Sequence, residues 1–268
     1  MESDRDTKHL DPGVIKEILG GSLFSSNIVF YEKIDSTNTH AKDLASKSAP
    51  EGTIVLAEEQ TAGRGRMKRR WLSHGYKNLL VSILLRPFLS VDRIFILTMI
   101  LAIAVIDGMK KSHGLDAMIK WPNDLYIGRK KIGGILSEFS VREKGIEYVI
   151  LGLGLNVNWK PEEQEGLLYP ATSVYAESGI EVSRNELLAQ ILKQFEVYYR
   201  EALSGRDEDL YKRWNEYSLI VGKEVDIESK GEKVQGTALR IDRQGALIIR
   251  RPDGAEQRIL SGDVSLRF

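Results

Sequence analysis

The sequence predicts an α+β fold with a mixed sheet and a small β-rich tail. Strand-like and helix-like segments alternate between residues 28 and 58, which indicates two strands separated by a helix. Further strand-like segments follow, and several are joined by links too short for a helical crossover, which favours antiparallel pairing. After Gly222, turn signals separate short strands. The chain has 268 residues, of which 42% are hydrophobic, so it can bury a sizeable core and is not a disordered protein.

The first part of the chain contains a short helix and the elements of the sheet. Asp11-Pro12 starts a helix over 14–19, and Gly20-Gly21 ends it. The links Asn123-Asp124 and Gly128-Arg129 are too short for a crossover and predict antiparallel neighbours. The expected elements are strand 28–33, helix 37–46 and the strands 53–58, 79–85, 117–121, 125–127, 132–139 and 148–157.

Two long helices are predicted from their apolar patterns. Residues 94–106 are apolar except for Thr98, and this stretch is well short of the roughly 20 residues that cross a bilayer. We therefore expect a buried core helix. Ser183 and Glu186 form a capping box, and apolar residues over 187–199 recur at helical spacing, which predicts a long amphipathic helix.

The tail shows the pattern of a small β-barrel, preceded by a helix at 208–217. Val225 and Ile227 alternate with polar neighbours, as in a half-buried strand, and turn signals at 243–245 and 252–254 separate the segments. About fifty residues of this kind are marginally stable alone, so we expect them to dock on a larger unit. The predicted organisation is an N-terminal extension, a main domain and a tail domain, over 1–26, 27–219 and 220–268.

Composition excludes several kinds of function. Lys and Arg together number 38, the same as Asp and Glu, and the zero net charge argues against an electrostatic grip on nucleic acid by the whole protein. Because there is no cysteine, disulfides, thiolate nucleophiles and Cys-based metal sites are excluded. The four histidines lack the spacing of metal ligands. The polar, acidic N-terminus lacks the apolar core of a signal peptide, so we expect a cytoplasmic protein.

The most informative segment is the basic glycine loop, residues 63–71, with the sequence GRGRMKRRW. Two glycines allow positive φ and close approach of the backbone to a ligand, and five of the eight residues before the tryptophan are cationic. Backbone N–H groups combined with guanidinium groups suit a phosphate or a carboxylate. The pattern is not that of a Walker loop. A solvated loop or a weak nucleic-acid patch remains the alternative for this motif alone.

Two further motifs place polar side chains at strand ends. In KWPND, residues 120–124, the proline interrupts a strand where an amide and a carboxylate are presented. Asp124 could bind Mg²⁺ on a polyphosphate, although a simple turn is the commoner use of Asn-Asp. In KKIGGIL, residues 130–136, a cation lies beside glycines that either leave room for a ligand or mark a bulge.

Three segments carry weaker signals. Asp35-Ser36-Thr37-Asn38 lies at a strand-to-helix junction and supplies hydroxyl groups, although N-capping alone would explain it. Gln60 lies near a strand end, just before the basic glycine loop. GLGLNVN, residues 152–158, contains G-x-G but neither a third glycine nor a following helix, which disfavours a dinucleotide site. None of these segments identifies a function by itself.

In their order and spacing, these motifs together resemble those of the biotin protein ligases. The motifs are DSTN, GRGRMKRRW, KWPNDL, KKIGGIL, GLGLNVN and the terminal SGDVSLRF, and the resemblance covers residues 28–268. It implies a catalytic domain related to class II aminoacyl-tRNA synthetases and an SH3-like C-terminal barrel. The chain begins where the DNA-binding domain of the family's regulatory members would have ended, so it is similar to the non-repressor type.

The resemblance implies an ATP-dependent ligase. Biotin and ATP would form biotinyl-5′-adenylate, and the biotinyl group would pass to a lysine of the biotin carboxyl carrier protein domain of a carboxylase. The implied cofactors are ATP and Mg²⁺, with biotin as the substrate. No DNA or membrane partner is expected, and the sequence leaves a homodimer open.

The resemblance also implies roles for residues that match the family's motifs. Those that would bind biotin are Ser36, Thr37, Asn38, Gln60, Gly63, Arg64, Gly65, Arg66, Lys131 and Gly133. Those that would bind ATP or the adenylate are Arg69, Trp71, Lys120, Asn123, Asp124, Lys131, Asn156 and Arg267, and Asp263 matches a partner of the last. The catalytic residues would be Lys131, Arg66 and Arg64, and Asp124 would hold Mg²⁺. Lys68 stands where the family usually has glycine.

Two rival functions are also compatible with the sequence. A lipoate ligase or octanoyltransferase shares the catalytic fold, but those families lack the combination of GRGR and KWPND. A nucleic-acid-binding module could use the basic glycine loop and the terminal barrel, but the zero net charge argues against it. The biotin ligase is therefore the preferred interpretation.

Overall fold

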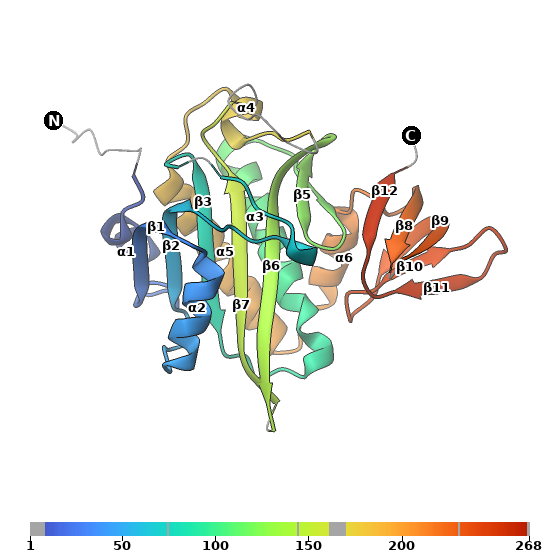
Figure 1. Ribbon diagram of the computed structural model, residues 1–268, viewed down its shortest axis with the longest axis horizontal. Helices are drawn as coiled ribbons and strands as arrows, with labels where there is room; N and C mark the ends of the chain where they lie inside the picture. Colours follow the sequence, from blue (N-terminus) through green and yellow to red (C-terminus); the bar gives the residue numbers. More distant parts are fainter. Residues whose placement is uncertain (1–8, 74, 144, 161–169, 230, 267–268) are drawn as a thin grey trace.

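The main sheet of the computed structural model contains seven strands (Figure 1). The structure describes residues 9–73, 75–143, 145–160, 170–229 and 231–266. β1 and β2 are parallel, and all other neighbouring pairs in this sheet are antiparallel, so the predicted mixed sheet is confirmed. The order across the sheet is β1 (Ile28–Ile34), β2 (Ile54–Gln60), β3 (Asn78–Leu85), β7 (Gly145–Asn156), β6 (Lys130–Arg142), β5 (Asp124–Ile127) and β4 (Met118–Lys120).

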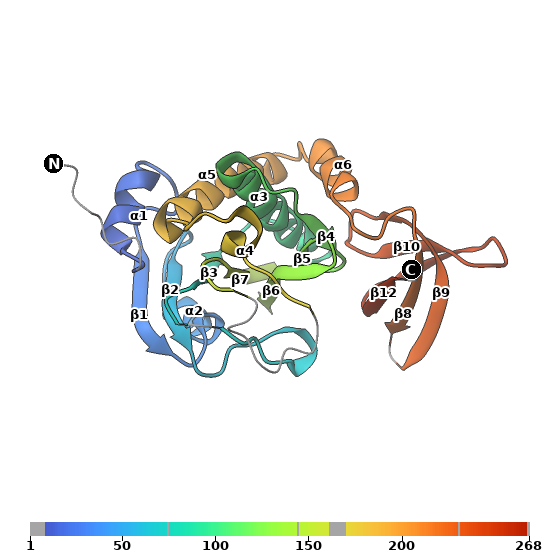
Figure 2. The ribbon, with the colours of Figure 1, turned by 90° about the horizontal axis from the view of Figure 1, so that it is seen from above.

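Helices lie on both faces of the main sheet (Figure 2). On one face α3 and α5 pack together, and α1 and α6 contact them; α2 lies on the opposite face, over β2 and β3. The helices are α1 (Pro12–Leu19), α2 (Thr37–Ser46), α3 (Phe95–His113), α4 (Val174–Ser178), α5 (Arg184–Leu203) and α6 (Glu208–Glu216), with 3₁₀ turns η1 (Arg66–Lys68) and η2 (Val91–Arg93). The sequence did not predict α4, because five residues are too few to show a helical period.

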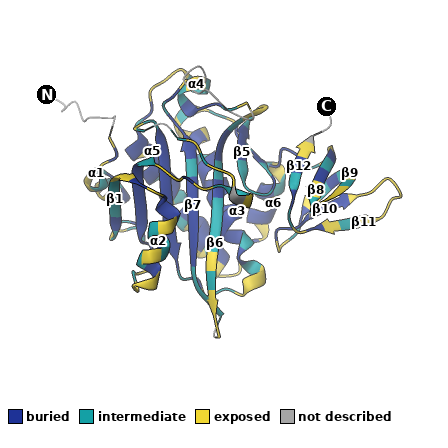
Figure 3. Cartoon of the chain, viewed as in Figure 1, coloured by how far each residue is buried: buried dark blue, intermediate teal, exposed yellow. Residues whose placement is uncertain are grey.

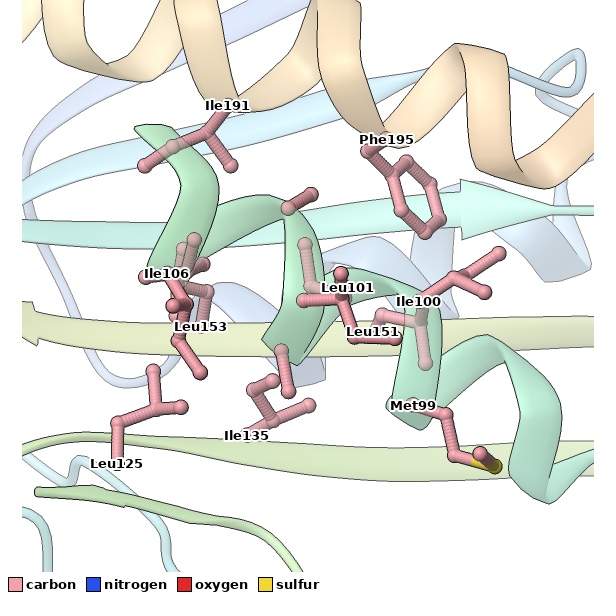
Figure 4. Packing of buried hydrophobic residues seen from close by; sticks show 14 of the residues in the cluster. Met99, Ile100, Leu101, Ile106, Leu125, Ile135, Leu151, Leu153, Ile191 and Phe195 are labelled. Atoms are coloured by element: carbon pink, nitrogen blue, oxygen red, sulfur yellow. The ribbon is translucent and has the colours of Figure 1, made fainter. Parts of the chain in front are cut away.

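The core lies between the main sheet and α3. Residues 96–106 are buried on every side of this helix because α5 covers the side turned away from the sheet. The helix extends to His113, beyond the predicted end at Ile106, and Gly108 in this extension packs closely against Ile191 of α5. Figure 4 shows Met99, Ile100, Leu101 and Ile106 of α3 gathered with Leu125, Ile135, Leu151 and Leu153 of the sheet and Ile191 and Phe195 of α5.

The opposite face of the main sheet is only partly covered. Figure 3 shows buried residues along the central strands, with exposed residues on the outer side of α2 and at the far end of β6. In the described part of the chain, none of the helices combines the length and the apolar character needed to cross a membrane. The uncovered part of this face is where a ligand can reach the sheet.

The tail forms a second sheet of five antiparallel strands. The predicted turns at 243–245 and 252–254 lie between β9 and β10 and between β10 and β11, so the β-rich tail is confirmed. In sheet order the strands are β11 (Glu256–Ile259), β10 (Leu247–Arg250), β9 (Glu232–Ile241), β8 (Glu224–Ser229) and β12 (Asp263–Leu266).

The turn between β9 and β10 anchors the tail sheet. Trp121 Nε1 donates a hydrogen bond to the Gly245 carbonyl (2.9 Å), and the Tyr211 hydroxyl donates to the Arg243 carbonyl (2.8 Å). Gly245 has a φ of +83°, and a Cβ atom there would overlap the ring of Phe95. Only glycine combines this conformation with such a close approach.

Gly245→Ala is expected to destabilise the protein by about 3 kcal/mol, because it adds overpacking against Phe95 to the strain of a positive φ. Gly254→Ala is the matched control, since Gly254 has a φ of +86° and open space around the missing Cβ. The control should lose about 1 kcal/mol. Urea unfolding monitored by tryptophan fluorescence measures both changes, and equal losses would contradict a tight contact at Gly245.

Candidate functional site

A cavity of about 450 Å³ lies beside α2 on the partly covered face of the main sheet. Its walls come from the start of α2, the basic glycine loop, the β4–β5 turn, the first half of β6, the end of β7, and β12 of the tail. The lining residues extend from Ser36 to Ser265, so both sheets contribute to one site.

Most of the predicted site residues line this cavity. Gly63 and Gly133 do not line it, and Arg267 lies outside the described residues. The cavity therefore gathers motifs that are far apart in the sequence. The predicted residues that line it are Ser36, Thr37, Asn38, Gln60, Arg64, Gly65, Arg66, Arg69, Trp71, Lys120, Asn123, Asp124, Lys131, Asn156 and Asp263.

The basic glycine loop folds back on itself as a narrow hairpin. Gly65 N donates to the Arg69 carbonyl (2.8 Å), and Trp71 N donates to the Gly63 carbonyl (3.0 Å). A Cβ atom at Gly63 would lie 2.6 Å from the Trp71 carbonyl oxygen, so glycine allows the two arms to approach. Gly63 therefore shapes the loop from outside the cavity, whereas the resemblance implied a direct contact with biotin.

Gly134, and not the predicted Gly133, lies on the cavity wall. A Cβ atom at Gly133 would meet the Gly154 carbonyl oxygen at 2.9 Å and the side chain of Leu155, which belongs to the core. At Gly134 it would lie near the side chains of Asp124 and Lys131. Gly133 does not line the cavity because adjacent strand residues face opposite sides of a sheet, and its backbone contact with a ligand stays a prediction.

Positive charge dominates the cavity wall. Lys131 Nζ donates to Asp124 Oδ1 (2.7 Å), and Arg69 forms an ion pair with Asp263. Four positive charges remain in excess over the carboxylates, which favours an anionic ligand. The lining side chains are the cations Arg64, Arg66, Arg69, Arg70, Lys120 and Lys131 and the carboxylates Asp124 and Asp263.

Burial shifts the pKa of two of these cations, Arg66 and Lys120. Burial lowers the pKa of Arg66, Asp124 opposes the shift, and Arg69 adds to it. Burial also lowers the pKa of Lys120, again opposed by Asp124 and reinforced by Lys131 and Arg69. A bound anion would stabilise both charged forms, and its attraction to them is stronger because little water screens it.

The KWPND motif presents its polar side chains where β4 ends and β5 begins. The Asn123 side chain donates to the Ile135 carbonyl (2.7 Å), and its Oδ1 accepts from Arg66 (3.2 Å). Asn123 therefore links the basic glycine loop to β6. The motif is a turn, as the simpler interpretation expected, and its side chains also line the cavity.

Polar groups at the start of α2 form another part of the wall. Ser36 occupies the N-cap position, but its side chain makes no capping hydrogen bond, so capping does not account for this residue. Gln60 Oε1 accepts from the backbone N–H of Thr37 (2.8 Å) and lies 3.1 Å from the Thr37 hydroxyl oxygen. These groups can bind an uncharged polar ligand.

The sequence did not predict that Gly152 and Gly154 line the cavity. A Cβ atom at Gly154 would lie 2.6 Å from the indole of Trp71, so this glycine makes room for the tryptophan. GLGLNVN is one of the motifs of the resemblance, but of its residues only Asn156 was assigned a ligand contact. Asn156 donates to the Thr172 carbonyl (2.9 Å), so its amide also holds the segment before α4.

The carboxylates of the cavity suit a metal ion only if a ligand completes the coordination. Among the residues that the structure describes, no group of three or more His, Cys, Asp or Glu side chains could hold a metal. Asp124 supplies a single carboxylate beside Lys131 and Lys120, and Mg²⁺ accepts one or two carboxylates when phosphate oxygens and water fill its other positions. Asp124 therefore fits Mg²⁺ carried by a polyphosphate.

The mixed sheet, the cation-rich cavity and the tail sheet together define an enzyme of the protein ligase class. Residues 30–156 match the biotin/lipoate A/B protein ligase family, and residues 220–267 match the biotin protein ligase C terminal domain. The chain belongs to this family and resembles its biotin protein ligases, as the motifs indicated.

Relatives and solved structures support the assignment. The chain is 34% identical to the bifunctional ligase/repressor BirA of Bacillus subtilis, over 95% of this chain and 77% of that protein. It is 30% identical to the biotin–[acetyl-CoA-carboxylase] ligase of Paracoccus denitrificans, over 84% of this chain and 94% of that protein. The biotin protein ligase of Aquifex aeolicus in complex with biotin and ATP superposes with a TM-score of 0.77 at 30% identity, over 90% of this chain and 99% of that one. The α+β fold class is confirmed.

Proposed function

We propose that this protein activates biotin with ATP as biotinyl-5′-adenylate and transfers the biotinyl group to a lysine of a biotin carboxyl carrier protein domain. The observation that carries the proposal is one cavity that joins polar groups at the start of α2 to a wall of cations. The uncharged ureido ring of biotin needs the polar groups, and the biotin carboxylate and the ATP phosphates need the cations next to them. The Aquifex protein that superposes on this chain was solved with biotin and ATP, and the Paracoccus relative is named for a carboxylase acceptor.

The polar part of the wall would hold the ureido ring of biotin. Ser36, Thr37, Asn38 and Gln60 all line this part of the cavity and offer hydroxyl and amide groups. The biotin carboxylate would then extend toward Arg64 and Arg66 of the basic glycine loop. This placement fixes the reacting carboxylate before the nucleotide binds.

Bringing a carboxylate to a phosphate requires neutralisation of two like charges. Lys131 and Arg66 would stabilise the charge that builds on the α-phosphate oxygens as the carboxylate oxygen attacks and pyrophosphate leaves. Lys120, Asn123, Arg69 and the indole of Trp71 would hold the nucleotide. No enzyme nucleophile is required, so the lack of cysteine has no chemical cost.

Asp124 is the residue that would hold Mg²⁺. The ion, when bound with ATP, supplies charge neutralisation on the phosphates. Its site would use one carboxylate of this chain, and Lys131 would exchange its ion pair with Asp124 for contacts to the reacting oxygens. The tail contributes Asp263 to the same wall, where it pairs with Arg69 and sets the position of that cation.

The mixed anhydride formed in the first step is prone to hydrolysis. The basic glycine loop, in covering the anhydride, would exclude water until the acceptor lysine arrives. The acceptor amine would then attack the carbonyl carbon, and AMP would leave with the phosphate oxygen. The loop residues would therefore control how long the intermediate stays bound.

Arg66→Ala is expected to release biotinyl-adenylate roughly thirtyfold faster, because one charge-assisted hydrogen bond is worth about 2 kcal/mol. The measurement is the rate at which the adenylate reaches the filtrate after rapid removal of free substrates. Lys47→Ala, at the exposed end of α2, removes a cation far from the cavity and should leave the rate unchanged. An unchanged rate for Arg66→Ala would remove this residue from its role.

Transfer of biotin to a purified carrier domain, with ATP and Mg²⁺, tests the proposed function. Avidin blotting should detect the modified carrier, and a carrier with arginine in place of the acceptor lysine should stay unmodified. Lipoate and octanoate are offered in parallel assays. Failure with biotin, or faster transfer of lipoate or octanoate, would refute the proposal and favour the rival ligase.

A further inference from the structure

A chain of polar residues, buried except for its partly exposed end at Glu138, runs behind the cavity wall, beneath α2. Ser82 of β3 and Leu136 of β6 each pair with Gly152 of β7, so the three lie in one row across the main sheet. Asn38 of α2 lies over this row, and a Cβ atom at Gly152 would overlap its side chain. Glu138 of β6 lies at the end of the chain. Neither Ser82 nor Glu138 lines the cavity, and both contact residues that do.

Hydrogen-bond chemistry fixes the orientation of the Asn38 amide. Its Nδ2 lies 2.9 Å from Glu138 Oε2 and 3.3 Å from the Leu136 carbonyl, and both of these partners only accept. Burial opposes ionisation of Glu138, but hydrogen bonds from Lys42 and Asn38 and the charges of Lys42 and Arg64 hold its pKa below the usual value. The Asn38 nitrogen must therefore face Glu138, and Oδ1 must face Ser82.

The orientation of Asn38 determines where the hydroxyl protons go. Ser82 Oγ lies 2.6 Å from Asn38 Oδ1, which only accepts, so the single Ser82 proton is directed there. Ser82 Oγ also lies 2.8 Å from Thr37 Oγ1, and a hydroxyl pair at this distance needs one proton between the oxygens. Thr37 must supply that proton, which leaves its lone pairs free to accept from a ligand.

We propose that Ser82 and Glu138 are positioning residues that hold the Thr37 hydroxyl as an acceptor for a ureido N–H of the substrate. The inference rests on the proposed function, since it takes biotin as the ligand of this wall. Glu138 acts through Asn38 and Ser82, and the direction of each donated proton follows from the one before. Ser82 thereby favours a cyclic urea over a ring that carries no N–H at this position.

Ser82→Ala tests the proposal. Without Ser82, the Thr37 hydroxyl keeps only the longer contact to Gln60 Oε1 (3.1 Å), so its proton can also rotate into the cavity, where it opposes a ligand N–H. The Kd of biotin, measured by calorimetry without ATP, is expected to rise about tenfold. Ser137→Ala is the matched control, because Ser137 is one residue from Glu138 on β6 and its buried hydroxyl has no hydrogen-bond partner among the described residues. Its Kd should equal that of the wild type.

Ligand analogues separate a positioning role from a structural one. In the two cyclic carbamate analogues of biotin, oxygen replaces one ureido N–H or the other. The wild-type preference for biotin over one of them should shrink about tenfold in Ser82→Ala and persist in Ser137→Ala. Glu138→Gln, whose neutral amide can face Asn38 with either end, should shrink the same preference. It is a second route to the result if Ser82→Ala folds poorly.

The outcomes distinguish this inference from the proposed function. If the wild type binds biotin but Ser82→Ala weakens biotin and both carbamates equally, Ser82 has a packing role and the inference is overturned. Unchanged affinities for biotin and for both carbamates in Ser82→Ala and in Glu138→Gln would overturn the inference as well. If the wild type itself does not bind biotin, the proposed function fails together with the inference.

Discussion

Lys131→Ala is expected to lower ATP–pyrophosphate exchange by about a thousandfold, because it removes a preorganised cation from the position where, in the proposed reaction, charge builds on the phosphate. Lys131 Nζ lies 2.7 Å from Asp124 Oδ1 and 5.7 Å from the centre of the Trp71 ring, so it points into the cavity. The fold should survive, because Lys131 is only half-buried and belongs to no apolar cluster.

The neighbouring lysine provides the control for this experiment. Lys130 is exposed and pairs with Glu177 outside the cavity, so Lys130→Ala removes the same charge one residue away. Its exchange rate should stay within about twofold of the wild type, as surface ion pairs contribute little. A wild-type rate of ATP–pyrophosphate exchange in Lys131→Ala, with circular dichroism confirming the fold, would contradict the assignment of Lys131 to the reaction.

Arg184→Met is expected to destabilise the protein by about 3–5 kcal/mol, because it leaves a buried carboxylate without its counter-ion. The side chains of Arg184 and Glu58 are both fully buried, with nitrogen–oxygen distances of 2.6 and 2.9 Å. Glu58 also accepts from the backbone N–H of Leu10 (2.7 Å), so the ion pair ties the segment before α1 to β2 and α5. Urea unfolding monitored by circular dichroism measures the loss.

Two further variants separate the ion pair from general disturbance. Arg240→Met breaks an exposed pair with Glu256 on the tail sheet and should cost less than about 1 kcal/mol. Combining Glu58→Gln with Arg184→Met removes both charges and keeps an acceptor for Leu10, so stability should partly recover. If Arg184→Met alone were as stable as Arg240→Met, then Glu58 would not need Arg184 as its counter-ion, which would contradict the structure.

Much of the fold could be predicted because its signals are local. The predicted helix 37–46 has the observed bounds, since a polar junction precedes it and its length fits one amphipathic segment. Ser183 accepts a hydrogen bond from Glu186 N, as a capping box requires, and α5 begins at Arg184. The end of α3 was missed because the prediction followed its apolar run, whereas its last turns pack through one face only.

The parts of the site that lie in sequence motifs could be predicted, whereas the parts that depend on strand pairing could not. The pairing of β5 with β6 changes register between Gly133 and Lys131 of β6. A change of one residue reverses the face of the sheet to which each side chain points. Nothing local in the sequence indicates whether Gly133 or Gly134 faces the cavity. Ser82 and Glu138 come from separate strands, and only their common neighbour Asn38 joins them. Such contacts are visible only once the sheet is assembled.

The shared walls of the cavity make ligand affinity a reporter on the whole chain. A molecule seated between Ser36 and Ser265 binds only when both sheets are formed and docked, so saturation with it shifts the folding equilibrium of both together. A substitution that loosens the tail sheet far from the cavity would then weaken biotin binding when the biotin concentration is limiting. Conversely, a saturating concentration of biotin would mask a moderate folding defect anywhere along the polypeptide.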